Sequence, residues 1–229
     1  MGDAEREWVA PAERFDAARE GLATLCGMVL EGVERAISAW LDADAPLADE
    51  VIAADGEIDR RSRELEDEIM GIHLRWSAFG ADLRLLHVGL IEAVALERVG
   101  NLAVEIARLT TRTAPPQSDV AHVNDEIRRM GELAVDALAA AAQALARSDV
   151  AAADRARHLS ARAEPMLDRV LTEVSRAFEQ ETSRRWSASA VLVARHIERV
   201  ANNAAELGGR VRFLVTGDED EQGRLTAAD

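Results

Sequence analysis

Pairs of acidic residues four positions apart are the feature of this sequence that could do chemistry. Residues i and i+4 lie on the same face of a helix, so each pair places two carboxyl groups side by side. Two carboxylates on one helix, with oxygen ligands from a neighbouring helix, could hold a cation such as Mg2+, Mn2+ or iron. The pairs, and the related rows that include an amide, are Asp55/Asp59, Glu164/Asp168, Glu97/Asn101/Glu105 and Glu198/Asn202/Glu206.

The same pattern also suits a solvated polar face. Like charges at this spacing cost about 0.2–0.5 kcal/mol per pair in an isolated helix, so water, an arginine or a cation should offset that cost. Arginines close in sequence could serve in place of a metal, namely Arg60, Arg98, Arg108 and Arg199. Spacing alone therefore leaves both a metal site and an arginine-paired surface open.

The two longer rows lie in a segment that occurs twice. Residues 96–106 read LERVGNLAVEI and residues 197–207 read IERVANNAAEL, with six of the eleven aligned positions identical. A repeat at this separation indicates an internal duplication. We therefore expect two copies of one unit, at 12–112 and 118–216, followed by an acidic tail at 217–229.

Apolar residues at intervals of three and four predict long helices throughout, and no strand-like alternation occurs. Proline, glycine and small polar residues predict breaks at 42–46, 76–80 and 113–117. Pro165 should kink or interrupt the helix that contains it. The expected helices span about 11–43, 47–73, 81–111, 119–147, 150–181 and 184–215. The predicted fold is all-α, with two tandem three-helix bundles of long antiparallel helices.

Composition narrows the function classes. The chain of 229 residues has a net charge of -15 and no lysine, which disfavours nucleic-acid binding because phosphate neutralisation dominates that affinity. No apolar segment is long enough to span a membrane, and the N-terminus lacks the apolar core of a signal peptide. The single cysteine, Cys26, fits a reducing compartment.

The repeated segment resembles the PhoU family of phosphate-signalling proteins. In that family each repeat ends with a helix reading approximately L-E-R-I-G-D-x-A-x-x-I-A, and the second copy often closes with an apolar run and Thr-Gly. The matching residues are LERVGNLAVEIARL from position 96, IERVANNAAELGGRVRFLVTG from position 197, and Asp-Leu-Arg at 82–84. With the two-times-three-helix plan, the resemblance covers about residues 12–217.

The resemblance also implies a metal motif, in which an acidic residue is followed four positions later by Asp on two helices of each repeat. The second-helix copies match, but on the third helices the expected aspartate is Asn in both repeats. An amide oxygen can ligate a hard cation but carries no charge, so we expect a weak, water-rich site for Mg2+, Mn2+, Zn2+ or iron. The implied ligands are Asp55, Asp59, Glu97, Asn101, Glu164, Asp168, Glu198 and Asn202.

The function implied by the resemblance is regulatory and non-enzymatic. Proteins of this family are cytoplasmic and link a phosphate ABC transporter to a two-component sensor kinase, restraining phosphate-starvation genes when phosphate is plentiful. The implied partners are the transporter's ATPase subunit, the sensor histidine kinase and a second copy of the chain in a homodimer. No nucleic acid and no direct membrane insertion are expected.

Two other classes of protein are alternatives to a non-enzymatic regulator. A ferritin-like di-metal bundle needs Glu-x-x-His motifs, and none of the five histidines follows a glutamate at that spacing. The remaining alternative is a metal-binding carboxylate bundle or divergent helical scaffold without a phosphate role. The repeated helix breaks favour compact bundles over one long coiled coil.

Overall fold

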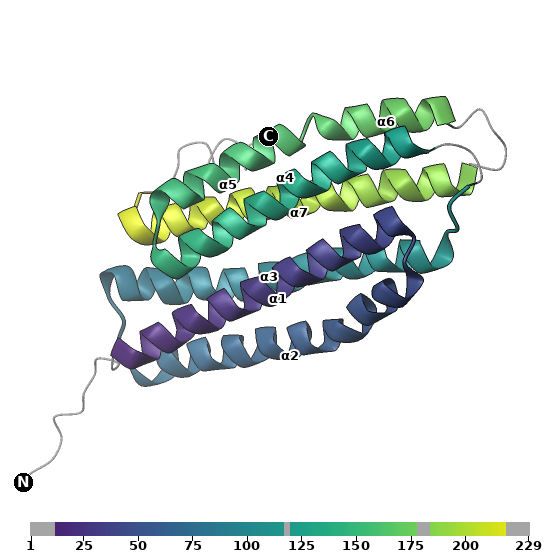
Figure 1. Cartoon of the computed structure of the whole chain (residues 1–229). Coiled ribbons are helices and arrows are strands. Elements are labelled where there is room, and N and C mark those ends of the chain that lie inside the picture. Colours follow the sequence, from purple (N-terminus) through teal and green to yellow (C-terminus); the bar gives the residue numbers. More distant parts are fainter. Residues whose placement is uncertain (1–11, 117–119, 178–183, 219–229) are drawn as a thin grey trace, which may run out of the picture.

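The computed structural model describes residues 12–116, 120–177 and 184–218, and every regular element in these residues is a helix (Figure 1). The helices are α1 (Ala12–Asp42), α2 (Ala45–Arg75), α3 (Gly80–Arg112), α4 (Ala121–Arg147), α5 (Val150–Ala163), α6 (Met166–Ala177) and α7 (Arg184–Thr216). Because α5 and α6 are two parts of one interrupted helix, the architecture is the predicted six-helix, all-α fold with two repeats.

Aspartate caps define two of the helix starts. Asp44 accepts a hydrogen bond from the backbone N–H of Leu47 at 3.0 Å, so α2 begins two residues before the expected position, with Pro46 inside its first turn. Asp149 caps α5 through the N–H groups of Ala151 and Ala152 at 2.9 and 3.1 Å. The predicted break at 42–46 is therefore found at residues 43–44, and α4 and α5 end and begin at the expected residues 147 and 150.

Pro165 interrupts the fifth helix as predicted. Helix α5 ends at Ala163 and α6 starts at Met166, because proline has no N–H to donate and its ring clashes with the preceding turn. Residues 178–181 of the expected helix lie outside the described residues, as does the part of the expected acidic tail at 219–229.

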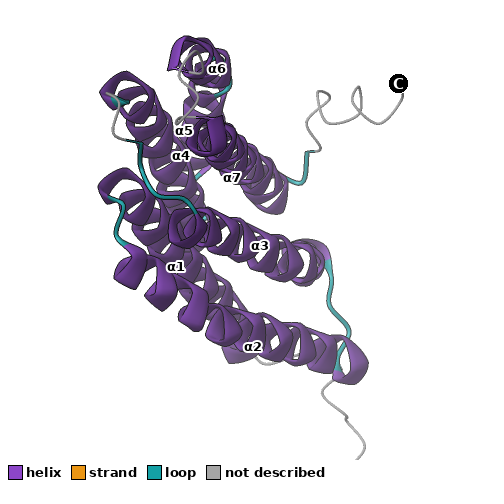
Figure 2. Cartoon of the chain, turned by 90° about the vertical axis from the view of Figure 1, so that its right-hand side faces the viewer, coloured by secondary structure: helices purple, strands orange, loops and turns teal. Residues whose placement is uncertain are grey.

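The two repeats pack side by side as two bundles (Figure 2). Helix α1 packs against α2 and α3 in the first bundle, while α4 packs against α5, α6 and α7 in the second. The seam between the bundles is formed by α3 against α7 and by α1 against α4. One continuous core of mostly alanine, valine, leucine and isoleucine runs through both bundles, so the repeats fold as one body.

Specific contacts hold the seam at both ends. Trp40 of α1 stacks on Trp186 of α7 with ring centroids 5.8 Å apart. At the opposite end, the Arg84 guanidinium donates from Nε to the carbonyl oxygen of Leu214 at 3.2 Å. None of the helices in the described part of the chain combines the length and apolarity that a membrane crossing requires.

Candidate metal and partner-binding site

The first carboxylate pair lies where α2 and α3 approach closely. A Cβ atom added at Gly100 of α3 would lie 3.2 Å from Cγ2 of Ile58 on α2, which is tighter than ordinary packing. Asp59 directly follows Ile58 in the chain, and Asn101 directly follows Gly100. Because residue 100 has no side chain, α2 and α3 can approach closely here. Both polar rows of the first repeat lie on these two helices.

The carboxyl groups of Asp55 and Asp59 are incompletely satisfied. Both side chains are half-buried, and Oδ1 of each is buried without a hydrogen-bond donor among the described residues. Burial raises the pKa of Asp55, and the negative charge of Asp59 raises it further. The site thus concentrates negative charge that a cation could neutralise.

Arginine and amide groups already offset part of this charge. Arg108 of α3 lowers the pKa of Asp55, which opposes the increase caused by burial and by Asp59. Nη1 of Arg108 also donates a hydrogen bond to Glu105 at 2.5 Å. Arg63 lies 3.5 Å from the Oδ2 atom of Asp59. Arginines therefore flank this pair of carboxylates, as the arginine-paired alternative expects, and the metal site stays a prediction.

The third-helix row of the first repeat is bonded within itself. Nδ2 of Asn101 donates to Oε1 of Glu97 at 2.6 Å. In this orientation the amide stabilises the glutamate and leaves its own Oδ1 as the atom that could ligate a cation. An aspartate at position 101 would instead repel Glu97, so the amide makes a metal less necessary here.

The second repeat arranges the corresponding residues differently. Glu198 is buried, with 8% of its surface exposed, and forms an ion pair with Arg195 one turn earlier on α7. Asn202 is exposed, and its Oδ1 lies 3.5 Å from the hydroxyl of Ser160 on α5. The other two predicted ligands, Glu164 and Asp168, are exposed on either side of the interruption at Pro165.

The donor sets decide how well each repeat fits a metal ion. The described residues contain no group of three or more His, Cys, Asp or Glu side chains placed to hold one. The first repeat offers two carboxylates, each with an oxygen that lacks a hydrogen-bond donor among the described residues, and carboxylate oxygens suit a hard cation such as Mg2+. The second repeat does not fit, because Arg195 already neutralises its buried glutamate.

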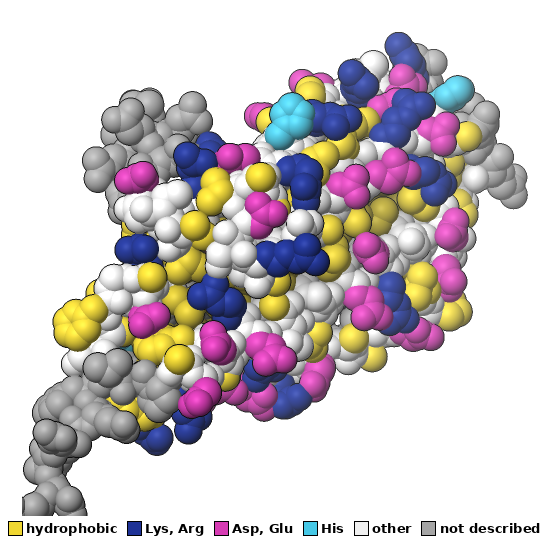
Figure 3. Space-filling model, turned by 60° about the vertical axis from the view of Figure 1, so that its left-hand side comes forward, with side chains coloured by type: hydrophobic (Ala, Val, Ile, Leu, Met, Phe, Trp, Pro, Cys, Tyr) yellow, Lys and Arg dark blue, Asp and Glu magenta, His cyan; other side chains and the backbone are white. Residues whose placement is uncertain are grey.

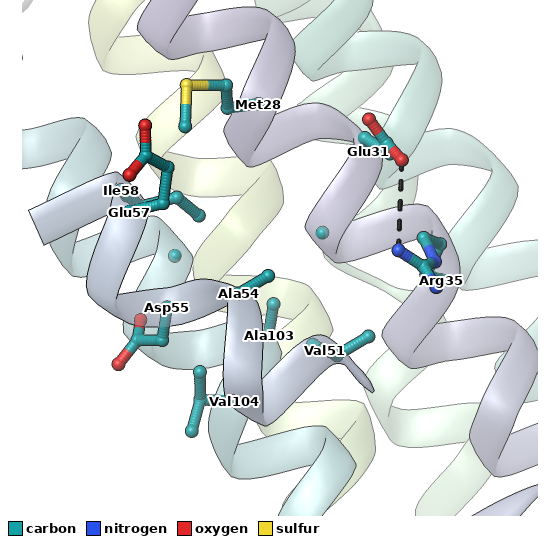
Figure 4. A pocket seen from close by; sticks show the side chains of 12 residues that line it. Met28, Glu31, Arg35, Val51, Ala54, Asp55, Glu57, Ile58, Ala103 and Val104 are labelled. Carbon is teal, nitrogen blue, oxygen red and sulfur yellow. Dashed lines mark ion pairs between the residues drawn. The ribbon is translucent and has the colours of Figure 1, made fainter. Parts of the chain in front are cut away.

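A small pocket that sequence reasoning missed opens beside Asp55 (Figure 4). It has a volume of about 140 Å3 and lies between α1, α2 and α3. Val51, Ile58, Ala103 and Val104 are among the apolar residues that line it. Its rim carries three carboxylates and one guanidinium, from Glu31, Asp55, Glu57 and Arg35. No sequence signal marks it, because it forms only where three separate helices meet.

Neither the molecular face seen in Figure 3 nor the single cysteine suggests a further site. On the face shown in Figure 3, acidic, basic and apolar side chains alternate, and neither sign of charge forms a continuous field. Cys26 is fully buried, and burial raises the pKa of its thiol to about 12, so it stays protonated at neutral pH.

Arg195 is a further residue of the site that the sequence analysis did not identify, although its position three residues before Glu198 could have revealed the ion pair.

The fold and the acidic rows define a class of all-helical proteins that are built from two similar bundles and carry paired carboxylates on the helices of each repeat. The sequence matches the PhoU domain twice, over residues 22–110 and 127–211. The chain therefore belongs to the PhoU family, as the resemblance of its repeated segment predicted.

Related proteins extend this match across nearly the whole chain. A Mycobacterium leprae protein named phosphate-specific transport system accessory protein PhoU homolog 1 is 29% identical over 91% of this chain and 94% of its own. The homolog 2 of Mycobacterium tuberculosis is 30% identical over 90% of this chain and 96% of its own. The crystal structure of PhoU from Pseudomonas aeruginosa superposes with a TM-score of 0.83 at 24% identity, covering 90% of this chain and 99% of that one, and supports the fold.

Proposed function

We propose that this protein regulates phosphate uptake and phosphate-starvation signalling as a cytoplasmic adaptor. It contacts the ATPase subunit of a phosphate ABC transporter and a sensor histidine kinase, and it restrains starvation genes when phosphate is plentiful. The observation that carries the proposal is the match of both repeats to the PhoU domain, together with relatives named as accessory proteins of a phosphate-specific transport system.

The physical character of the molecule is compatible with an adaptor. Long helices with one continuous core form a stiff body whose outer faces remain available for protein contacts. We propose that the repeats span 12–112 and 118–216, and that the protein acts as a homodimer. Its acidic excess lies mainly in the first repeat, whereas acidic and basic residues are nearly balanced in the described second repeat. Basic partner surfaces would therefore favour the first bundle.

Affinity capture from the protein's own cells tests the adaptor role. Tagged protein would be purified from cells grown in high phosphate, and the retained proteins identified by mass spectrometry. The proposal predicts recovery of the transporter ATPase subunit or the sensor kinase, and purified partners should then bind directly. Recovery of neither partner, with correctly folded bait, would remove the support for an adaptor role.

A hard divalent cation at the first carboxylate pair is a second, more limited proposal. The free Oδ1 atoms of Asp55 and Asp59 favour it, and Glu97 and Asn101 are the remaining predicted ligands of that repeat. The cation would neutralise the repulsion between the two carboxylates and would have no catalytic task. The corresponding site of the second repeat is not included, because Glu198 is already paired.

A further inference from the structure

We propose that the pocket between α1, α2 and α3 is a docking site for one side-chain motif of a partner protein: a large apolar residue with an arginine or lysine one helical turn away. The proposal rests on the adaptor function for the existence of a partner. It adds where that partner binds and which chemistry the partner must present.

The size of the pocket selects the apolar part of the motif. Its volume of about 140 Å3 is close to that of a protein cavity of about 150 Å3 that holds one benzene ring. Its floor is built from apolar and small residues, including Gly32 of α1 and Gly100 of α3. A single aromatic or branched aliphatic side chain would fill it, as anchor residues do at the centres of protein interfaces.

The rim of the pocket selects the cationic part of the motif. Its one guanidinium, Arg35, is already paired with Glu31 at 3.8 Å and with Glu50. The rim glutamate Glu57 is likewise paired, with Arg60. The carboxylate of Asp55 differs, because it forms no hydrogen bond or ion pair with the other described residues; its Oδ1 is buried, which leaves Oδ2 as the oxygen that a partner can reach.

An incoming arginine or lysine would pair with Oδ2 of Asp55, in place of the divalent cation proposed above, while the neighbouring apolar side chain enters the pocket. Arg108 of α3 acts on Asp55 only through its charge, since its hydrogen bond goes to Glu105. Figure 4 shows the two sides of the opening, with Glu31 and Arg35 on one helix and Asp55 and Glu57 on the facing one. A cation is favoured at this rim and an anion is repelled.

The chain offers a matched pair of variants for the test. A Cβ at Gly32 would meet only Cβ of Ala103 and Cδ1 of Ile58, both at 4.0 Å, so Gly32→Leu places a side chain in the pocket without backbone strain. Gly27 lies on the same helix, and an added Cβ there would meet no atom within 4 Å other than its chain neighbours and its own helix backbone, so Gly27→Leu is the control. Both changes replace a helix-interior glycine with a better helix former, so both variants should fold.

The first arm of the experiment tests the pocket with three small probes of one shape: benzamidine, benzamide and benzoate. Methyl NMR spectra of the full chain in EDTA would follow Met28, Val51, Ile58 and Val104. We expect shifts with the benzamidinium cation, weaker shifts with neutral benzamide and none with benzoate. Gly32→Leu should abolish them and Gly27→Leu should keep them. Equal binding of all three probes, or of none, overturns the proposal.

The second arm measures binding of the purified transporter ATPase subunit or sensor kinase. We expect Gly32→Leu to weaken binding by at least about thirtyfold, as for a lost anchor contact. Asp55→Asn should weaken it by about three- to tenfold, and Gly27→Leu should leave it unchanged. If the wild-type chain binds the partner and Gly32→Leu binds equally well, the pocket proposal fails and the adaptor function stands. If the wild-type chain binds neither partner, the adaptor function itself fails.

Discussion

Glu92 of α3 and Arg210 of α7 form an ion pair across the seam between the repeats, with Oε1 and Nη1 2.7 Å apart. Only 1% of the Glu92 side chain is exposed, and burial raises the pKa of its carboxyl group although Arg210 opposes the shift. Arg210 also contacts Glu206 at 3.2 Å. A buried charge on one repeat thus depends on the other repeat for its neutralisation.

Removing one partner of this pair should be costly. Arg210→Ala leaves the Glu92 carboxyl group buried and unpaired, so we expect a loss of about 2–3 kcal/mol in the free energy of unfolding, less than for a fully buried arginine. Urea denaturation would measure it. The double variant Glu92→Leu/Arg210→Leu should recover most of the loss, because it removes the buried charge. If Arg210→Ala is as stable as the wild-type chain, the ion pair does not stabilise the contact between the repeats.

Two adjacent glycines in α7 should respond in opposite directions to the same substitution. A Cβ at Gly208 would lie 2.7 Å from the backbone oxygen of Ala153 on α5, so Gly208→Ala should destabilise by about 1–3 kcal/mol. At Gly209 an added Cβ would meet no atom within 4 Å other than its chain neighbours and its own helix backbone, so Gly209→Ala should stabilise by about 0.5–1 kcal/mol. Thermal or urea unfolding of the two variants checks this; equal effects would contradict the close packing of α5 on α7.

The raised pKa of Asp55 makes a prediction about pH. Because the folded chain holds this proton more tightly than the unfolded chain, the ionised group destabilises the fold at neutral pH, and the cost disappears as pH falls below the ordinary value of 3.8. Asp55→Asn should therefore stabilise the chain at neutral pH and not in acid, because it removes both the buried charge and a like-charge pair that costs about 0.2–0.5 kcal/mol. Asp67→Asn, an exposed change on the same helix, should alter stability little at either pH.

Divalent cations should act through the same pair of carboxylates. Adding Mg2+ should raise the melting temperature of the wild-type chain, because an ion that binds only the folded state stabilises it. The double variant Asp55→Asn/Asp59→Asn should lose this rise, whereas Glu164→Gln, at the exposed position of the second repeat, should keep it. An equal rise in all three proteins would place the cation elsewhere.

Local sequence signals predicted the fold well. Periodic apolar residues predicted the helices, and Asp44, Asp149 and Pro165 act locally, so the helix ends and breaks could be predicted near their observed positions. The duplicated segment predicted two repeats and the family. These features depend on residues a few positions apart, which the sequence shows directly.

The candidate site was less predictable because its character depends on packing between helices. Spacing identified Asp55 and Asp59, but their buried oxygens result from the fit of α2 against α3. The Glu92–Arg210 pair joins residues 118 positions apart, and the pocket requires three helices at once. The predicted ligands of the second repeat stay a prediction that the pairing of Glu198 with Arg195 disfavours.

The central claim is that this protein restrains phosphate-starvation signalling, and the most direct measurement is the expression of a phosphate-starvation gene in cells that lack the protein. In high phosphate, we predict high expression in the deletion strain and normal repression once the wild-type chain is restored. Repression that persists in the deletion strain, with the transporter and kinase present, would contradict the claim.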